Sequence, residues 1–87
     1  MSPTISRLLG ITIRLYYEEH GVPHFRAHYG EFNSAISIET LEVLQGELPP
    51  RVRALVLEWA AEQRAGLREN WRRAQAHQTL RRLDPLE

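Results

Sequence analysis

Three side chains that could do acid–base and phosphate chemistry recur at every second residue of one short segment. They are His24, Arg26 and His28. In a regular β-strand such residues project to the same side, about 6–7 Å apart from one to the next. Two imidazoles and a guanidinium on one side suit metal-independent RNA cleavage. One His removes the 2′-hydroxyl proton, the other protonates the leaving 5′-oxygen, and Arg stabilises the charge that develops on phosphorus.

Further polar side chains would lie close to this trio. Arg14 and Tyr16 are expected beside it on a neighbouring strand, and Glu31 follows the strand end. The candidate catalytic residues are therefore His24, His28, Arg26, Tyr16, Arg14 and Glu31. A plainer alternative stays open, in which the same side chains form only a solvated or protein-binding surface.

Neither a metal centre nor a cofactor is expected. His24 and His28 are separated by about 13 Å of strand rise, which is too far to hold one ion directly. The chain has no Cys, which excludes disulfides and Cys-based zinc or iron–sulfur sites. All 11 basic residues are Arg, which excludes Schiff-base and phosphate-loop lysines.

Composition limits the class of protein. The 87 residues suffice for a single domain, 1–87, and the 43% hydrophobic and 25% charged fractions are ordinary for a globular fold. The basic and acidic residues, 11 of each, cancel, so affinity for phosphate would have to come from a local patch. The sequence has neither an apolar run long enough to span a membrane nor a secretory leader, so we expect a cytoplasmic protein without a membrane partner.

The elements that must position these residues fall into two halves, the first of which, about 4–46, is typical of strands. Hydrophobic and polar residues alternate over 11–15 and again over 24–29, the pattern of half-buried strands. Shorter apolar runs at 35–38 and 41–44 predict two more strands. The separations are short, as in an antiparallel meander.

The second half predicts a helix at about 50–76 and an extended tail over 77–87. Two prolines mark the helix start, and apolar residues then recur at spacings of three and four. Gly66 within this helix indicates a kink or a close contact. In the tail, Leu80 and Leu83 could fasten the chain back onto the body or onto a partner.

These elements predict an α+β fold. A small antiparallel sheet of three to four strands packs on one long C-terminal helix, because neither layer can bury its apolar face alone. The helix would cover one face of the sheet. The opposite face, with the candidate residues, would stay open to solvent or to a partner.

Two long stretches resemble a known bacterial family. The segment 3–32, PTISRLLGITIRLYYEEHGVPHFRAHYGEF, and the segment 38–71 resemble the two halves of domain of unknown function 4160, and residues 83–87 resemble its ending. The matching positions are Arg7, Arg14, Tyr16, His20, His24, Tyr29 and Gly30. The second His of the family's usual H-F-H is Arg26 here, and His28 stands at a variable position.

The resemblance implies the DhiT-like toxin of a bacterial type II toxin–antitoxin pair, neutralised by a cognate antitoxin protein. The first hypothesis is accordingly a toxin that acts on RNA or translation as a ribonuclease. The departure at Arg26 implies either that His28 replaces the missing imidazole or that this member is weakened or inactive. The alternative is a non-enzymatic module whose open sheet face or edge strand docks the partner. A homodimer formed through exposed sheet edges is a third hypothesis.

Overall fold

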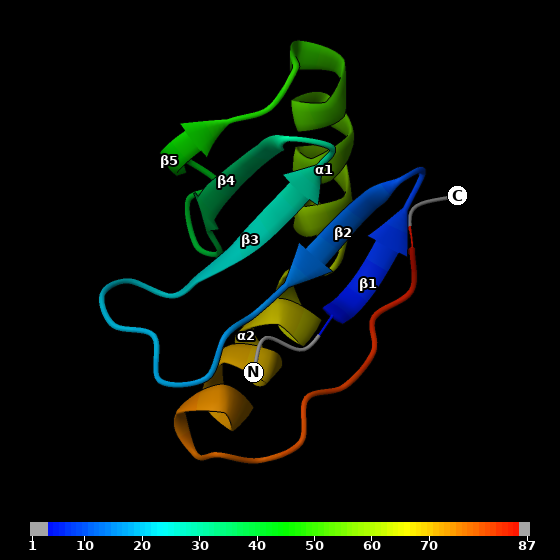
Figure 1. The fold of residues 1–87 in the computed structure, drawn as a ribbon. Coiled ribbons are helices and arrows are strands. Elements are labelled where there is room, and N and C mark those ends of the chain that lie inside the picture. The colour runs from blue at the N-terminus through cyan, green and yellow to red at the C-terminus, as the bar shows by residue number, and fades with distance from the viewer. Residues whose placement is uncertain (1–3, 86–87) are drawn as a thin grey trace.

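A computed structural model describes residues 4–85 of the chain, and in it a five-stranded sheet precedes two helices (Figure 1). The elements are β1 (Thr4–Leu8), β2 (Ile11–Arg14), β3 (His24–Tyr29), β4 (Phe32–Ser37), β5 (Val43–Glu47), α1 (Pro50–Glu62) and α2 (Arg64–Gln75). The strands are antiparallel and adjacent in chain order, β1-β2-β3-β4-β5. The α+β class and the antiparallel meander are thus confirmed.

The expected three to four strands are too few. A strand that was not predicted separately, β1, precedes the predicted strand at 11–15, and Leu9 and Gly10 turn the chain between the two with φ angles of 48° and 83°. A left-handed backbone of this kind favours glycine, so Gly10 permits a tight β1–β2 hairpin. The later strands were expected at 35–38 and 41–44, and both are displaced. They lie at β4 and β5, because the chain turns again at Leu41, where φ is 63°.

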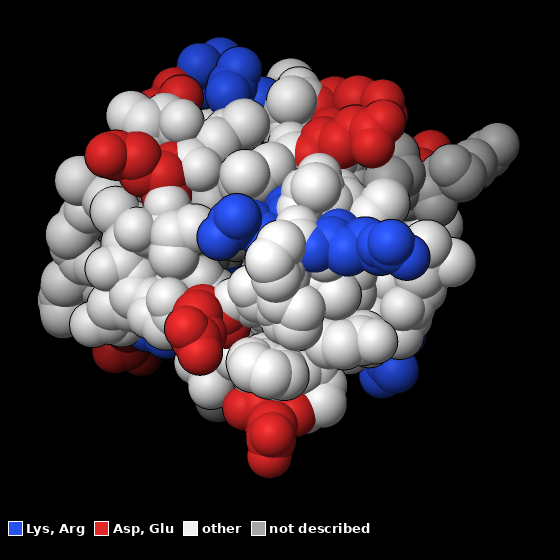
Figure 2. Space-filling view, turned by 90° about the horizontal axis from the view of Figure 1, so that it is seen from above, with Lys and Arg blue, Asp and Glu red and all other residues white. Residues whose placement is uncertain are grey.

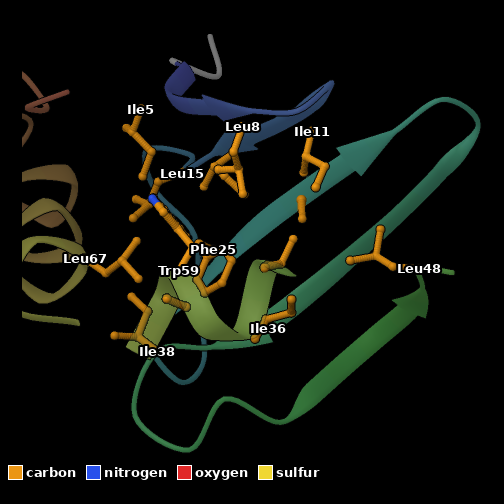
Figure 3. Packing of buried hydrophobic residues seen from close by; sticks show 14 of the residues in the cluster. Ile5, Leu8, Ile11, Leu15, Phe25, Ile36, Ile38, Leu48, Trp59 and Leu67 are labelled. Atoms are coloured by element: carbon orange, nitrogen blue, oxygen red, sulfur yellow. The ribbon is translucent and has the colours of Figure 1, made fainter. Parts of the chain in front are cut away.

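The hydrophobic core lies between one face of the sheet and the helices (Figure 3). Ile13, Phe25 and Ile36, from three neighbouring strands, are fully buried on this face. Trp59 of α1 packs edge-on against Phe25, with ring centroids 6.0 Å apart. The alternation in β2 and β3 therefore does bury one side of each strand, as the sequence pattern predicts.

The expected single helix over 50–76 is also wrong, because the helix is broken at Gln63. This residue has φ −101° and ψ 16°, and it separates α1 from α2. The break gives the two helices different directions, so α1 covers the sheet while α2 lies beyond its lower end (Figure 1). Gly66 is not the break. It makes the close contact instead, since a Cβ there would lie 2.7 Å from Leu83 Cδ2.

Residues 78–85, here called the C-terminal strap, run back beside β1 (Figure 1). The Leu83 amide donates to the Ile5 carbonyl at 2.8 Å, and the Ser6 hydroxyl donates to the Leu83 carbonyl at 2.9 Å. Trp59 Nε1 donates to the carbonyl of Asp84 at 2.8 Å. The expectation that Leu83 fastens the tail to the body is confirmed, and Leu80 also packs on the core. Residues 86 and 87 of the predicted tail lie outside the described residues.

The strap is also held from α2 by a buried amide. Asn70 has no exposed surface, its Nδ2 donates to the Arg81 carbonyl at 2.9 Å, and its Oδ1 accepts from the Arg81 amide at 2.8 Å. One side chain thus pairs with both backbone groups of one strap residue. Within residues 4–85, neither helix has the length and apolar character needed to cross a lipid bilayer.

Candidate functional site

The sheet face turned away from α1 is here called the back face, and β2 and β3 set its residues side by side. Arg14 lies directly opposite Arg26, and Thr12 lies opposite His28 in the same ladder. The intervening residues of β3, Phe25 and Ala27, are fully buried on the core side. The strand therefore brings His24, Arg26 and His28 to one face.

Arg26 is the centre of a compact charge cluster. Its Nε and Nη2 donate to Glu19 Oε1 at 3.0 and 2.9 Å, and its Cζ lies 5.4 Å from the centre of the Tyr16 ring. Burial would raise the pKa of Glu19, but hydrogen bonds from Arg26 and His24 outweigh it and hold that pKa below its ordinary value. The guanidinium is thus fixed by a carboxylate and by an aromatic face.

His24 is more enclosed than an open strand position implies. It is 8% exposed, and its ring lies against Trp71 of α2, with centroids 5.3 Å apart. Nδ1 is 2.8 Å from the Val22 carbonyl, and because a carbonyl only accepts, this nitrogen carries a proton. Nε2 is 3.3 Å from Glu19 Oε1. Both ring nitrogens of His24 are therefore engaged by the loop that precedes β3.

His28, in contrast to His24, has a ring nitrogen without a hydrogen-bond partner among the described residues. The side chain is half-buried, and this nitrogen, Nε2, is enclosed. Burial, followed by the positive charges of Arg14 and Arg26, lowers the pKa of His28 below the ordinary value for histidine. The imidazole is consequently neutral at pH 7 and able to accept a proton.

The structure does not bring every candidate together. His24 and His28 stand at the two ends of β3, about 13 Å apart by strand rise, so they cannot both act on one scissile bond without movement of the strand. Glu31 is exposed in the β3–β4 turn, at the end of β3 opposite His24. It faces a shallow hollow shared with Glu47.

The carboxylate that joins the cluster is Glu19, which the sequence analysis did not select. The strand pattern gives no signal for it, because Glu19 lies in the loop between β2 and β3. The turn residues Gly21 and Pro23 could have indicated that this loop folds back toward β3. Gln75 of α2 holds the loop in place by donating to the Glu19 carbonyl at 3.1 Å.

A hollow of about 400 Å³ opens beside this cluster. The loop 19–22 forms one wall, His24 and Arg26 line it from β3, and Leu44 lines it from β5. The hollow thus combines charged and apolar groups. Within residues 4–85, no group of three or more His, Asp or Glu side chains is arranged to hold a metal ion.

Charge on the face seen from above is dispersed. Seen from above, the Arg side chains form small separate groups with acidic groups between them (Figure 2). This end of the molecule carries no extended basic field, in keeping with the zero net charge. Because the net charge of the chain is zero, attraction for phosphate would have to come from a local feature such as the Arg14 and Arg26 pair.

Comparison with known proteins identifies a family. The family model described as domain of unknown function (DUF4160) matches residues 10–72, which include β2 to β5, α1 and most of α2. No curated protein and no solved structure shows significant similarity to the chain.

Proposed function

This chain belongs to the DUF4160 family, and we propose that it is the toxin of a bacterial type II toxin–antitoxin pair that cleaves RNA at its back face. The toxin role rests on the sequence resemblance to DhiT-like proteins. The chemistry rests on one observation, a histidine of lowered pKa that is influenced by two guanidinium groups on an open sheet face. The site of action would be the cytoplasm, where such a toxin meets RNA and its antitoxin.

His28 is the general base of this proposal. Because Nε2 is enclosed, Nδ1 is the nitrogen that would remove the proton of a ribose 2′-hydroxyl, and the 2′-oxygen then attacks phosphorus. Arg14 and Arg26 lie opposite each other on β2 and β3 and bind the phosphate oxygens as their charge increases. The lowered pKa suits the task, since a base must be unprotonated at the operating pH.

Tyr16 is the proton donor that we assign to the leaving group. Arg26 Cζ lies 5.4 Å from the centre of its ring, so the Tyr16 side chain would stand beside a phosphate held by that guanidinium. The P–O5′ bond breaks and the 5′-oxygen takes the phenol proton. His28 then releases the proton that it took from the 2′-hydroxyl and Tyr16 regains one, both through solvent, so the reaction consumes no net proton and no water. The products are a 2′,3′-cyclic phosphate and a 5′-hydroxyl.

Glu19 and His24 are positioning residues in this scheme. Glu19 holds Arg26 through two hydrogen bonds, and His24 braces Glu19 from the other side. Replacing Glu19 with Gln would leave the guanidinium less well oriented, while His28 would keep its role as base. A loss of phosphate affinity larger than the loss of turnover is the expected signature.

The test is incubation of the pure protein with a single-stranded RNA oligonucleotide in the presence of EDTA. We expect cleavage to 2′,3′-cyclic phosphate ends, identified by mass spectrometry, and no cleavage of the all-deoxy oligonucleotide. His28→Ala should slow the reaction by about 10²–10⁴-fold, the usual contribution of a general base. The rate should rise with pH through a pKa below the ordinary histidine value and then level off. His77→Ala is the matched control, because His77 lies beyond the end of α2.

Equal rates for the wild type, His28→Ala and His77→Ala would reject the assignment of His28. The same three proteins, induced in bacteria, test the toxin role, since growth arrest should be lost only with His28→Ala. Intact RNA combined with growth arrest in all three would favour the second candidate function, a non-enzymatic binding module. The observation that favours this candidate is the exposed edge strand β5.

A further inference from the structure

The two edges of the sheet differ in how they are covered. At the β1 edge, the C-terminal strap bonds to Ile5 and Ser6. At the other edge, β5 pairs with β4 only, and no described strand lies on its outer side. All five residues of β5 are exposed. An edge strand of this kind presents backbone donors and acceptors to an incoming strand.

The exposed edge also carries apolar side chains. Val43 is 40% exposed and Leu44 is 43% exposed, although they begin the strand that lies farthest from the core. The ladder with β4 is irregular between Ala35 and Ile36, which leaves Leu44 without a direct partner. Leu44 lines the hollow on the back face, while Val43 pairs with Ile36. An added strand would therefore find one apolar contact at each face.

Carboxylates stand at both ends of this edge. Glu42 precedes β5, Glu47 ends it, and Glu31 shares the hollow beside Glu47. None of the three forms an ion pair with any residue of the described part of the chain. In contrast, Glu19, Glu39 and Glu69 are each paired with Arg. The ends of β5 thus hold negative charge that the fold itself does not neutralise.

We propose that the outer edge of β5 is a docking site for an extended segment of a partner protein, with an apolar centre and Arg or Lys at each end. The backbone would supply the hydrogen bonds, Val43 and Leu44 the apolar contacts, and Glu42 and Glu47 the selection of basic ends. The inference is independent of the RNA chemistry proposed for the back face.

A second copy of this chain fits the edge poorly. Antiparallel pairing of two β5 strands about Gln45, their middle residue, would place Glu47 opposite Val43 of the other copy and one position from its Glu42. A register one residue away, with Leu44 opposite Gln45, would set Glu42 and Glu47 directly opposite each other. Like charges directly opposite each other in a sheet are destabilising. The charge pattern therefore selects a basic partner over self-association.

The experiment uses the full chain labelled with ¹⁵N and two synthetic peptides, Arg-Thr-Val-Thr-Val-Thr-Arg and the same peptide with Glu at both ends. NMR titration gives the affinity, and amide hydrogen exchange locates the contact. We expect the Arg-ended peptide to bind at least tenfold more tightly and to protect amides of residues 43–47. Reversing both charges, Glu42→Arg with Glu47→Arg, should invert the preference between the peptides.

The matched control is Glu58→Arg with Glu62→Arg, which reverses two exposed carboxylates of α1 and should leave the preference unchanged. Leu44→Asp should weaken binding of the Arg-ended peptide at least tenfold without unfolding the chain, because Leu44 is exposed. Equal binding of both peptides, or protection outside residues 43–47, would overturn the proposal. A stable dimer of the free chain by sedimentation, lost in Leu44→Asp, would also overturn it and would assign the edge to self-association.

Discussion

Replacing Asn70 with Ala should destabilise the fold by about 2 kcal/mol. The buried amide makes two hydrogen bonds to the backbone of Arg81, at 2.9 and 2.8 Å. Each such bond contributes about 1–1.5 kcal/mol net, so their loss costs about 2–3 kcal/mol. Ala favours the interior of α2 over Asn by roughly 0.6 kcal/mol, which offsets part of that loss. For a chain of this size, the remaining difference lowers the melting temperature by about 8–16 °C.

Urea denaturation and thermal melting followed by circular dichroism measure this effect. Asn33→Ala is the control, because Asn33 is exposed in β4 and should change the unfolding free energy by less than about 0.5 kcal/mol. Hydrogen exchange of the Arg81 amide should accelerate in Asn70→Ala, since that amide loses its acceptor. Equal stability of the two variants, with the Arg81 amide still protected, would refute the assignment of Asn70 as the anchor of the strap.

Two further predictions concern acid and packing. Because the folded pKa of Glu19 lies below 4.5, its stabilising contribution is complete above pH 4.5 and is lost as the pH falls below that value. The difference in unfolding free energy between wild type and Glu19→Gln should therefore shrink from pH 7 to pH 3, and a constant difference in urea titrations would contradict it.

Gly66→Ala places a Cβ 2.7 Å from Leu83 Cδ2. The effect of Gly66→Ala on the free energy of unfolding should be about 1 kcal/mol more favourable in a Leu83→Ala background than in the wild type. Additive effects in the double-mutant cycle would refute this contact.

The parts of the fold that the sequence predicts correctly are those with a strong local period. The alternation in β2 and β3 fixes which side chains enter the core, and the spacing of apolar residues after Pro50 indicates helix. The number of strands could not be obtained this way. β1 is irregular, since Ile5 and Ser6 are both buried, and its ladder with β2 shifts register between Thr4 and Ser6. The break at Gln63 also lacks a local signal, because Gln is a good helix former.

In the candidate site, too, some features could be predicted from the sequence and others could not. Strand alternation correctly places His24, Arg26 and His28 on one face, and the structure also puts Arg14 beside them. The alternation of apolar and polar residues does not indicate how deeply each side chain on that face is buried. His24 is enclosed because the break between the helices lets Trp71 reach its ring. Contacts of this type join segments far apart in the sequence, so they are determined by the packing of whole elements.

The C-terminal strap has a consequence for biosynthesis. Residues 78–85 leave the ribosome after every element that they bind, namely β1, α1 and α2. Until they emerge, the edge of β1, the indole N–H of Trp59 and the amide of Asn70 have no strap to pair with. The nascent chain therefore cannot complete its core until residues 78–85 have emerged from the ribosome. Its sheet has two open edges during that interval, and open edges of this kind favour premature association.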